Sequence, residues 1–192
     1  TVGATVSETA QNVLVVGPAV GDVTDELCTQ LLTDVQPADS ILGVSVVQSP
    51  SDRRRRWTDH GSLEEFDVEF VDVDTDTRAA SAAEHTQPTR QITTVADPTD
   101  LSTLGRTVGE RLTAADGRTS MCFHSVTDIL DFVERERALE LLHTLAEEVK
   151  SADAHAHYHL DASQDEETVE LLGTVTDRVI DLSPDGSDVS VR

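Results

Sequence analysis

The chain has 192 residues, 37 acidic against 14 basic, so its formal net charge is −23, and its length suits one α/β domain with a full core. That charge argues against nucleic acid as a partner, because phosphate recognition needs a basic surface. No apolar run reaches the roughly 18 residues of a membrane span, and no charged segment followed by an apolar one opens the chain. We therefore expect neither a membrane protein nor a secreted one.

The acidic excess and the single lysine, Lys150, are typical of adaptation to molar salt. At molar salt the Debye length falls to about 3 Å, so crowded surface carboxylates repel one another little while keeping the surface hydrated. We therefore expect a cytoplasm of high salt. Cys28 and Cys122 lie far apart in apolar periodic contexts, which predicts buried, reduced thiols.

The N-terminal part of the chain predicts two strands around one helix. Residues 1–11 are small and polar and predict a flexible lead-in. The apolar run 12–16 predicts the first strand, and 22–32 predicts a helix with acidic residues in its first turn, where the helix dipole favours them. Residues 41–47 predict a buried strand rich in β-branched side chains, and 51–64 predict a polar connection.

The middle of the chain is less regular. Residues 68–73 alternate apolar and acidic side chains, which is typical of a half-exposed edge strand. Residues 74–89 have no pattern and predict a mobile loop. A short strand is expected at 92–95 and an amphipathic helix at 101–115.

The C-terminal part returns to a regular alternation of strand and helix. Strands are expected at 119–123, 154–160 and 178–182, and helices at 126–151 and 166–175.

Strands that alternate with helices predict a mostly parallel sheet with helices on both faces. The sequence thus predicts a three-layer α/β fold with about six or seven strands. One domain is expected over 12–182, and 183–192 form a C-terminal strand or a tail.

A turn of small residues from Gly17 to Gly21 follows the first strand and opens into a helix. A strand, a glycine-rich turn and a helix in this order form the layout of a phosphate-binding loop. The pattern G-x-x-x-x-G-K-[ST] needs a lysine on the phosphates, but Asp22 stands after the second glycine, and a carboxylate repels a polyphosphate. Thr24 could supply a hydroxyl for Mg²⁺, yet without the lysine a structural turn is favoured over a phosphate site.

Two strand ends provide candidate residues for lining a cleft. The strand 119–123 ends in His124 and Ser125, where an Asp that holds a metal would be expected. His159 and Asp161 stand at the end of a later strand, and sites in α/β sheets lie at such carboxyl ends. Imidazole is a poor ligand for Mg²⁺. His124 could therefore bind a softer metal or a partner, but a hydrogen bond beside the first turn is the favoured interpretation, and Ser125 is a candidate helix cap.

The segment from His155 to His159 alternates histidine with other residues. On a strand His155, His157 and His159 would share one face, so three imidazoles could converge on a metal. Positions two apart on a strand are about 6.6 Å from each other, which is far for three ligands of one ion. A row of imidazoles that faces a helix or cleft is therefore the favoured interpretation, and no metal or other cofactor is expected.

The only basic cluster of the sequence consists of Arg53, Arg54, Arg55 and Arg56, and Trp57 follows it. Such a cluster could contact an acidic partner, with Trp57 as a stacking residue. The alternative is a loop that neutralises carboxylates of its own chain.

With these residues in view, the chain resembles the RecA/KaiC-like ATPase superfamily, and within it haloarchaeal proteins regarded as inactivated members. The junction from His124 to Leu130 is similar to the superfamily's strand end "hydrophobic run-Asp-Ser-hydrophobic", and the strand ending at Asp161 and the segment 176–182 follow the family order. The turn from Gly17 to Gly21 is the N-terminal match. The family's phosphate-loop lysine is missing, and His124 stands in place of its Asp.

The resemblance implies a RecA-like core kept for binding, in signal transduction or gene regulation, with a protein partner that could be a second copy or an active paralogue. Our leading hypothesis is a non-catalytic domain that acts through protein contacts. Two alternatives stay open: a nucleotide binder or slow ATPase that uses an atypical loop at 17–24, and a metal site at His155, His157 and His159.

Overall fold

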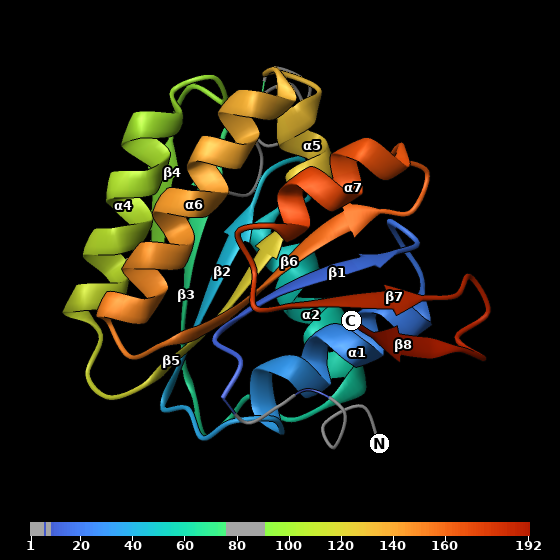
Figure 1. Cartoon of the computed structure of the whole chain (residues 1–192). Coiled ribbons are helices and arrows are strands. Elements are labelled where there is room, and N and C mark those ends of the chain that lie inside the picture. The colour runs from blue at the N-terminus through green and yellow to red at the C-terminus, as the bar shows by residue number, and fades with distance from the viewer. Residues whose placement is uncertain (1–5, 7–8, 76–90) are drawn as a thin grey trace.

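A central β-sheet lies between two layers of helices (Figure 1). The computed structural model describes residues 6, 9–75 and 91–192. The mostly parallel sheet with helices on both faces confirms the predicted three-layer α/β fold. The sheet has eight strands rather than six or seven, because the C-terminal tail adds one at the edge.

All seven strands expected from the apolar runs are present. The strands are β1 (Asn12–Gly17), β2 (Ser40–Ser45), β3 (Asp67–Val73), β4 (Ile92–Val95), β5 (Thr119–His124), β6 (His155–Asp161), β7 (Arg178–Leu182) and β8 (Val189–Val191). Their order across the sheet is β4-β3-β2-β5-β6-β1-β7-β8, and each adjacent pair is parallel except β7 and β8. The carboxyl ends of β2, β5, β6 and β1 therefore lie next to one another.

The helices divide between the two faces of the sheet. One face is covered by α1 (Asp22–Thr33) and α2 (Pro50–His60), and the other by α4 (Leu101–Ala114), α5 (Val126–Leu130), α6 (Arg135–Ser151) and α7 (Glu166–Gly173). No helix of the described residues combines the length and the apolar character needed to cross a bilayer.

Side chains of each strand alternate between these two faces. On β5, Phe123 joins the large apolar cluster under α4 to α7, whereas its neighbour Cys122 joins a smaller cluster under α1 and α2. On β6, Tyr158 points to the first of these clusters, and His157 contacts Cys28 of α1 on the opposite face. This alternation decides which residues can meet in a site.

The single long helix expected at 126–151 is two helices, α5 and α6. Val133 is followed by four charged residues, and the next buried side chain, Ala138, comes five positions later. An apolar face repeats every three or four residues, so a straight helix could not keep both side chains in the core. The turn between the helices restores the phase.

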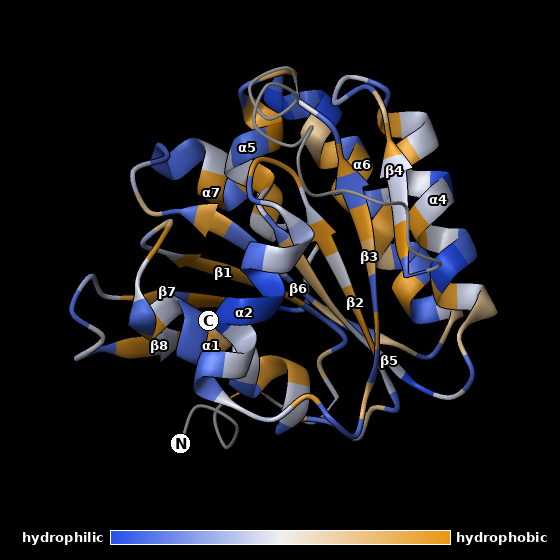
Figure 2. Ribbon diagram, turned by 180° about the vertical axis from the view of Figure 1, so that it is seen from behind, coloured by the Kyte–Doolittle hydropathy of each residue, from blue (hydrophilic) through white to orange (hydrophobic). Residues whose placement is uncertain are grey.

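The prediction of a polar connection at 51–64 is wrong, because most of this segment is helix α2. Ser49 caps the helix by accepting a hydrogen bond from the backbone N–H of Asp52. The buried side of α2 carries Arg53 and Trp57, so its inward face includes a charged residue that hydropathy counts as polar. Figure 2 shows α2 as hydrophilic along most of its length.

Two further expectations are changed at the ends and edges of the sheet, and a third is not tested. β3 is not an edge strand, since β4 pairs with it on one side and β2 on the other, and Val71 and Val73 are fully buried. Val6 and Ala10, in the expected lead-in, are buried against β1, α1 and β7. The loop expected at 74–89 falls largely on 76–90, outside the described residues.

Candidate functional site

The turn after β1 is closed by its own atoms. The hydroxyl of Thr24 donates a hydrogen bond to the carbonyl oxygen of Pro18 at 3.0 Å, and Thr24 is buried. Gly21 has a φ of 138°, which favours glycine, and it precedes α1 without a side-chain cap. Asp22 is exposed at the first position of the helix. The turn has the layout of a phosphate loop, but its hydroxyl already has a partner.

His124 and Asp161 are the last residues of β5 and β6, and Asp161 lies beside the start of this turn. Asp161 is opposite Gly17 in the pairing of β1 with β6, and His124 is opposite Ser45 in the pairing of β2 with β5. The pKa of Asp161 is lowered chiefly by hydrogen bonds from Ser163, and the backbone N–H of Ala19 lowers it further. A carboxylate of the chain therefore lies next to the start of the turn, where a phosphate loop would present its amides to a ligand.

His124 is held neutral in this position. Burial is the main cause that lowers the pKa of its imidazole well below the usual value, and the neighbouring His159 lowers it further. The two rings have their centroids 5.0 Å apart. Neither ring nitrogen of His124 makes a hydrogen bond of ordinary geometry within the described residues. Such an imidazole is a poor substitute for the carboxylate that holds Mg²⁺ in an ATPase.

Ser125 caps α5. Its hydroxyl accepts a hydrogen bond from the backbone N–H of Asp128 at 3.2 Å, and the peptide bond between His124 and Ser125 is cis. Next to it, the hydroxyl of Thr127 accepts a hydrogen bond from the backbone N–H of Asp161 at 2.8 Å. These bonds fix the ends of β5 and β6 beside each other.

The basic cluster on α2 is divided between core and surface. The guanidinium group of Arg53 is buried in an ion pair with Asp25 of α1, and Arg56 binds the same carboxylate at 2.9 Å. Trp57 is fully buried and stacks on Phe70, with ring centroids 5.3 Å apart. Arg53 and Trp57 therefore cannot contact a partner in this structure, which corrects that part of the prediction.

Two arginines of the cluster stay on the surface. Arg54 is exposed, and so is Arg55, whose guanidinium group binds Asp52 at 3.1 Å on the same helix. The remaining candidates for a partner contact are thus Arg54 and Arg55. The alternative interpretation, that the cluster neutralises carboxylates of its own chain, describes Arg53, Arg55 and Arg56, which pair with Asp25 or Asp52.

The three alternating histidines share the face under α1 and α2, as expected for a strand. His157 and His159 lie in a cluster with Cys28 of α1 and Cys122 of β5, and His155 lies outside it. One ligand atom from each of these four side chains lies within 4.8 Å of the other three. The sequence predicts no metal and leaves a set of three histidines as an alternative; the structure instead groups two histidines with two cysteines, which we call the Cys–His cluster.

Short contacts converge on one sulfur atom of this cluster. Cys28 Sγ is 3.3 Å from Cys122 Sγ and 3.1 Å from His157 Nε2, and it accepts a hydrogen bond from Trp57 Nε1 at 3.2 Å. Burial raises the pKa of Cys28, yet the hydrogen bond from Cys122 and the nearby imidazoles bring it well below the usual value. The pKa of Cys122 is raised, mainly by burial and by its hydrogen bond with Cys28. The pair favours one thiolate beside one thiol.

Sequence reasoning missed the cysteines as part of this site. Cys28 and Cys122 are 94 residues apart, and neither belongs to a local ligand motif. The usable signal was the spacing of His157 and His159, combined with the order of strands that puts β5 beside β6. That order is a property of the whole sheet and is absent from the local pattern.

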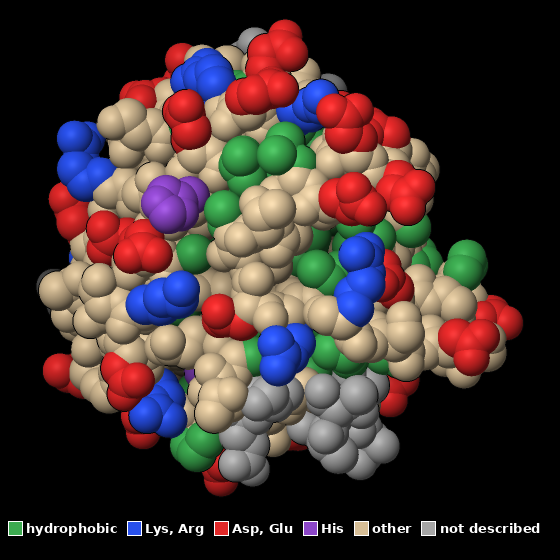
Figure 3. All heavy atoms as spheres, viewed as in Figure 1, with side chains coloured by type: hydrophobic (Ala, Val, Ile, Leu, Met, Phe, Trp, Pro, Cys, Tyr) green, Lys and Arg blue, Asp and Glu red, His purple; other side chains and the backbone are tan. Residues whose placement is uncertain are grey.

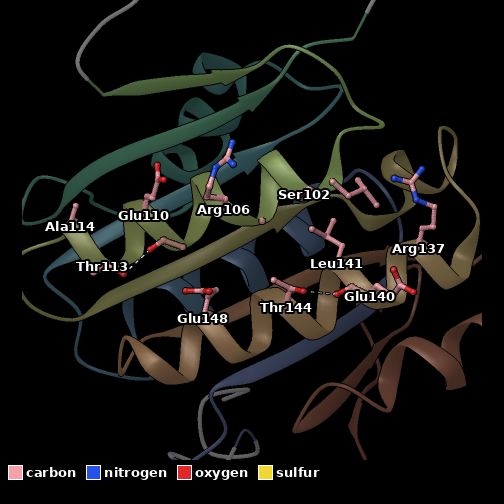
Figure 4. A pocket seen from close by; sticks show the side chains of 13 residues that line it. Ser102, Arg106, Glu110, Thr113, Ala114, Arg137, Glu140, Leu141, Thr144 and Glu148 are labelled. Carbon is pink, nitrogen blue, oxygen red and sulfur yellow. Dashed lines mark hydrogen bonds between the residues drawn. The ribbon is translucent and has the colours of Figure 1, made fainter.

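A groove between α4 and α6 lies on the opposite face of the sheet (Figure 4). It has a volume of about 850 Å³, and Gly105 and Gly109 line it on the α4 side. The hydroxyl of Thr113 donates to the carbonyl of Gly109, and that of Thr144 donates to the carbonyl of Glu140. These hydroxyls are bound to their own helices, so the groove offers a shape but no activated group.

A family of unknown function, DUF7504, matches residues 10–182 of the chain. The chain belongs to DUF7504. No curated protein sequence matches this DUF7504 protein. The family match spans all strands from β1 to β7, so it covers the turn, both strand ends and the Cys–His cluster.

Solved structures show the fold of this DUF7504 protein to be KaiC-like. A KaiC-like protein from the hyperthermophilic archaeon Pyrococcus horikoshii OT3 is 15% identical with a TM-score of 0.56, over 94% of this chain and 76% of that one. An uncharacterized Pyrococcus horikoshii protein in complex with an unknown peptide is 14% identical with a TM-score of 0.58, over 95% and 82%. A third protein, from Pyrococcus horikoshii OT3, is 8% identical with a TM-score of 0.62, over 94% and 85%.

Proposed function

We propose that this protein is a RecA/KaiC-like domain without nucleotide hydrolysis, which acts through protein contacts in signalling or gene regulation in a cytoplasm of high salt. The observation that carries the proposal is the chemistry of the turn after β1. Residues 17–24 contain neither lysine nor arginine, the hydroxyl of Thr24 is bound to Pro18, and Asp161 lies opposite Gly17 at the start of the turn. A polyphosphate would meet negative charge there without a cation to offset it.

The arginines of α2 do not supply that cation. Arg53 and Arg56 are both paired with Asp25, which lies one helical turn beyond Gly21. To reach a nucleotide, Arg53 would leave the buried carboxylate of Asp25 without its partner, which is costly inside a protein. The ion pairs therefore support a role in holding α2 against α1.

The surface supports contacts with proteins rather than with nucleic acids. Figure 3 shows acidic side chains spread over the face formed by α4, α6 and α7, with basic side chains among them. Arg54 and Arg55 stay exposed on the opposite face of the sheet, and one structural neighbour was solved with an unknown peptide. Acidic surfaces stay soluble in molar salt, where repulsion between them is screened.

The alternative function is nucleotide binding, or slow hydrolysis, at the atypical turn. One observation favours it: α1 begins after Gly21 without a hydrogen bond from a capping side chain. The N-terminus of a helix favours anions through its amide groups and its dipole.

Thermal unfolding with and without nucleotides separates the two functions. Mg-ATP, Mg-ADP and Mg-GTP would each be added in molar KCl, with a competent KaiC-like ATPase as the positive control. A ligand at a hundredfold excess over its Kd adds about 2.7 kcal/mol, which raises Tm by several degrees in a domain of this size. We expect no shift for this protein. A reproducible shift with one nucleotide would contradict the proposal and favour the alternative.

The contact surface on α2 is tested by exchanging only its exposed arginines. In the double variant Arg54→Ser/Arg55→Ser, a partner found by crosslinking to the wild type is expected to be lost while Tm stays unchanged. Arg178→Ser, which removes an exposed arginine from β7, is the matched control. If crosslinking persists in the double variant, the contact does not use α2.

A further inference from the structure

The Cys–His cluster contains a ligand set that neither the fold nor the proposed function accounts for. It lies between the sheet and helix α1, and all four of its side chains are buried. In the part of the chain that the structure describes, Nε2 of His159 is buried and makes no hydrogen bond of ordinary geometry. A buried polar atom without a partner costs stability, so it calls for a physical explanation.

We propose that Cys28, Cys122, His157 and His159 form a buried site for one divalent transition-metal ion, and that zinc is the ion that fits this donor set. Two sulfur and two imidazole ligands are a common set for structural zinc. Because this set leaves no position for water, the site is structural rather than catalytic.

The geometry of the cluster is close to that of a tetrahedral site. With metal–sulfur distances of about 2.3 Å and metal–nitrogen distances of about 2.0–2.1 Å, neighbouring ligand atoms are about 3.3–3.8 Å apart. In that geometry two sulfur ligands are about 3.8 Å apart and a sulfur and a nitrogen ligand about 3.6 Å apart. The observed separations are 3.3 Å between Cys28 Sγ and Cys122 Sγ and 3.1 Å between Cys28 Sγ and His157 Nε2, each about half an ångström shorter. All four ligand atoms lie within 4.8 Å of one another, so small side-chain movements would complete the tetrahedron.

The backbone explains why these four residues meet. His157 and His159 are two positions apart on β6 and therefore point to the same face. Cys122 lies opposite His157 in the pairing of β5 with β6, and Cys28 reaches the cluster from α1 above the sheet. Ligands from two adjacent strands and one helix are thus held on regular elements rather than on loops.

The charge balance also suits a metal. Two thiolates offset the double positive charge of zinc, so the occupied site is neutral, as burial in a medium of low dielectric requires. The nearby carboxylate of Asp25 is already paired with Arg53 and Arg56, so it is not left as an unpaired charge beside the site. Trp57 Nε1 donates to Cys28 Sγ, the kind of outer hydrogen bond that orients a metal ligand.

The test measures zinc directly. The full chain would be refolded in molar KCl with a thiol-free reductant and zinc ion, freed of unbound metal by gel filtration, and analysed for its metal content. We expect about one zinc ion per chain in the wild type and far less in Cys122→Ser and His157→Gln. The matched control is His155→Gln, which changes a histidine on the same face of β6 outside the cluster and should keep zinc.

Cobalt binding to the wild type provides a second measurement, which does not depend on how well the variants fold. Wild-type protein refolded with Co²⁺ should show the visible absorption of tetrahedral cobalt with thiolate ligands, and added zinc should remove it. Trp57→Phe removes the hydrogen bond to Cys28 and should weaken metal binding by about tenfold to a hundredfold while the stoichiometry is kept.

Several outcomes would overturn the proposal. The first is a wild type that binds no zinc. The second is an equal zinc content in His157→Gln and wild type, and the third is a loss of zinc from the His155→Gln control alone. The fourth is a Cys28–Cys122 disulfide that forms on refolding without reductant whether or not zinc is present. The proposal does not depend on whether the turn after β1 binds nucleotide, so each can fail without the other.

Discussion

On the face of the sheet under α4 to α7, the buried side chains are mostly Leu, Val, Ile and Ala, with Phe123 and Tyr158 between them. On the opposite face, four imidazoles, two thiols and the Arg53–Asp25 ion pair are buried together with apolar residues. Burying apolar surface stabilises a fold without further conditions, whereas a buried polar group costs free energy unless it is paired. The comparison indicates that packing alone stabilises the first face, whereas the stability of the second also depends on how its buried polar groups are paired.

The largest effect is expected from removing one charge on the polar face. Asp25→Asn leaves Arg53 buried without its counter-charge, and breaking a buried pair in this way costs about 3–5 kcal/mol of unfolding free energy. Denaturant unfolding in molar KCl measures it. Asp52→Asn, which breaks the exposed pair with Arg55, is the control and should cost at most about 1 kcal/mol. Equal losses in both variants would show that the buried pair has no special role.

A comparable loss of unfolding free energy is expected on the apolar face, and this loss should not depend on metal. Leu145 is fully buried in the cluster under α4 to α7, and Leu145→Ala should cost about 2–5 kcal/mol because it leaves a cavity. Since the mechanism is packing alone, this loss should be the same after refolding with zinc or with a chelator. Glu147→Ala, an exposed change on the same helix, should stay within about 0.5 kcal/mol. A loss at Leu145 that changes with zinc would mean that the two faces are coupled.

The smallest effect is expected at the rim, at the N-terminal cap of α7. Asp165 accepts hydrogen bonds from the backbone N–H and the hydroxyl of Thr168, which lower its pKa below the usual value. A carboxyl group with a lowered folded-state pKa stabilises the protein above its unfolded pKa, and this contribution is lost as pH falls through the folded-state value. Asp165→Asn keeps a capping side chain but removes this pH dependence. The difference between the two Tm-against-pH curves below pH 4 measures it, and parallel curves would refute the assignment.

Much of the architecture could be predicted from local patterns. The runs 12–16 and 119–123 and most of 41–47 are strands because β-branched and apolar residues suit a sheet that is buried on both faces; the strand within 41–47, β2, ends at Ser45. The division of 126–151 into two helices was also present in the sequence, as a shift in apolar phase after Val133. Helix α2 was missed because its buried face carries Arg53, whose charge is neutralised by a residue on another helix.

The site divides in the same way. The sequence alone determined that the turn from Gly17 to Gly21 lacks a lysine, and that His157 and His159 share a face, because both follow from residue identity and the period of a strand. Only the tertiary structure decided that Cys28 and Cys122 join those histidines and that Trp57 is buried. These facts depend on which strands are neighbours and on where α1 and α2 lie, and such contacts between distant segments leave no periodic trace in the chain.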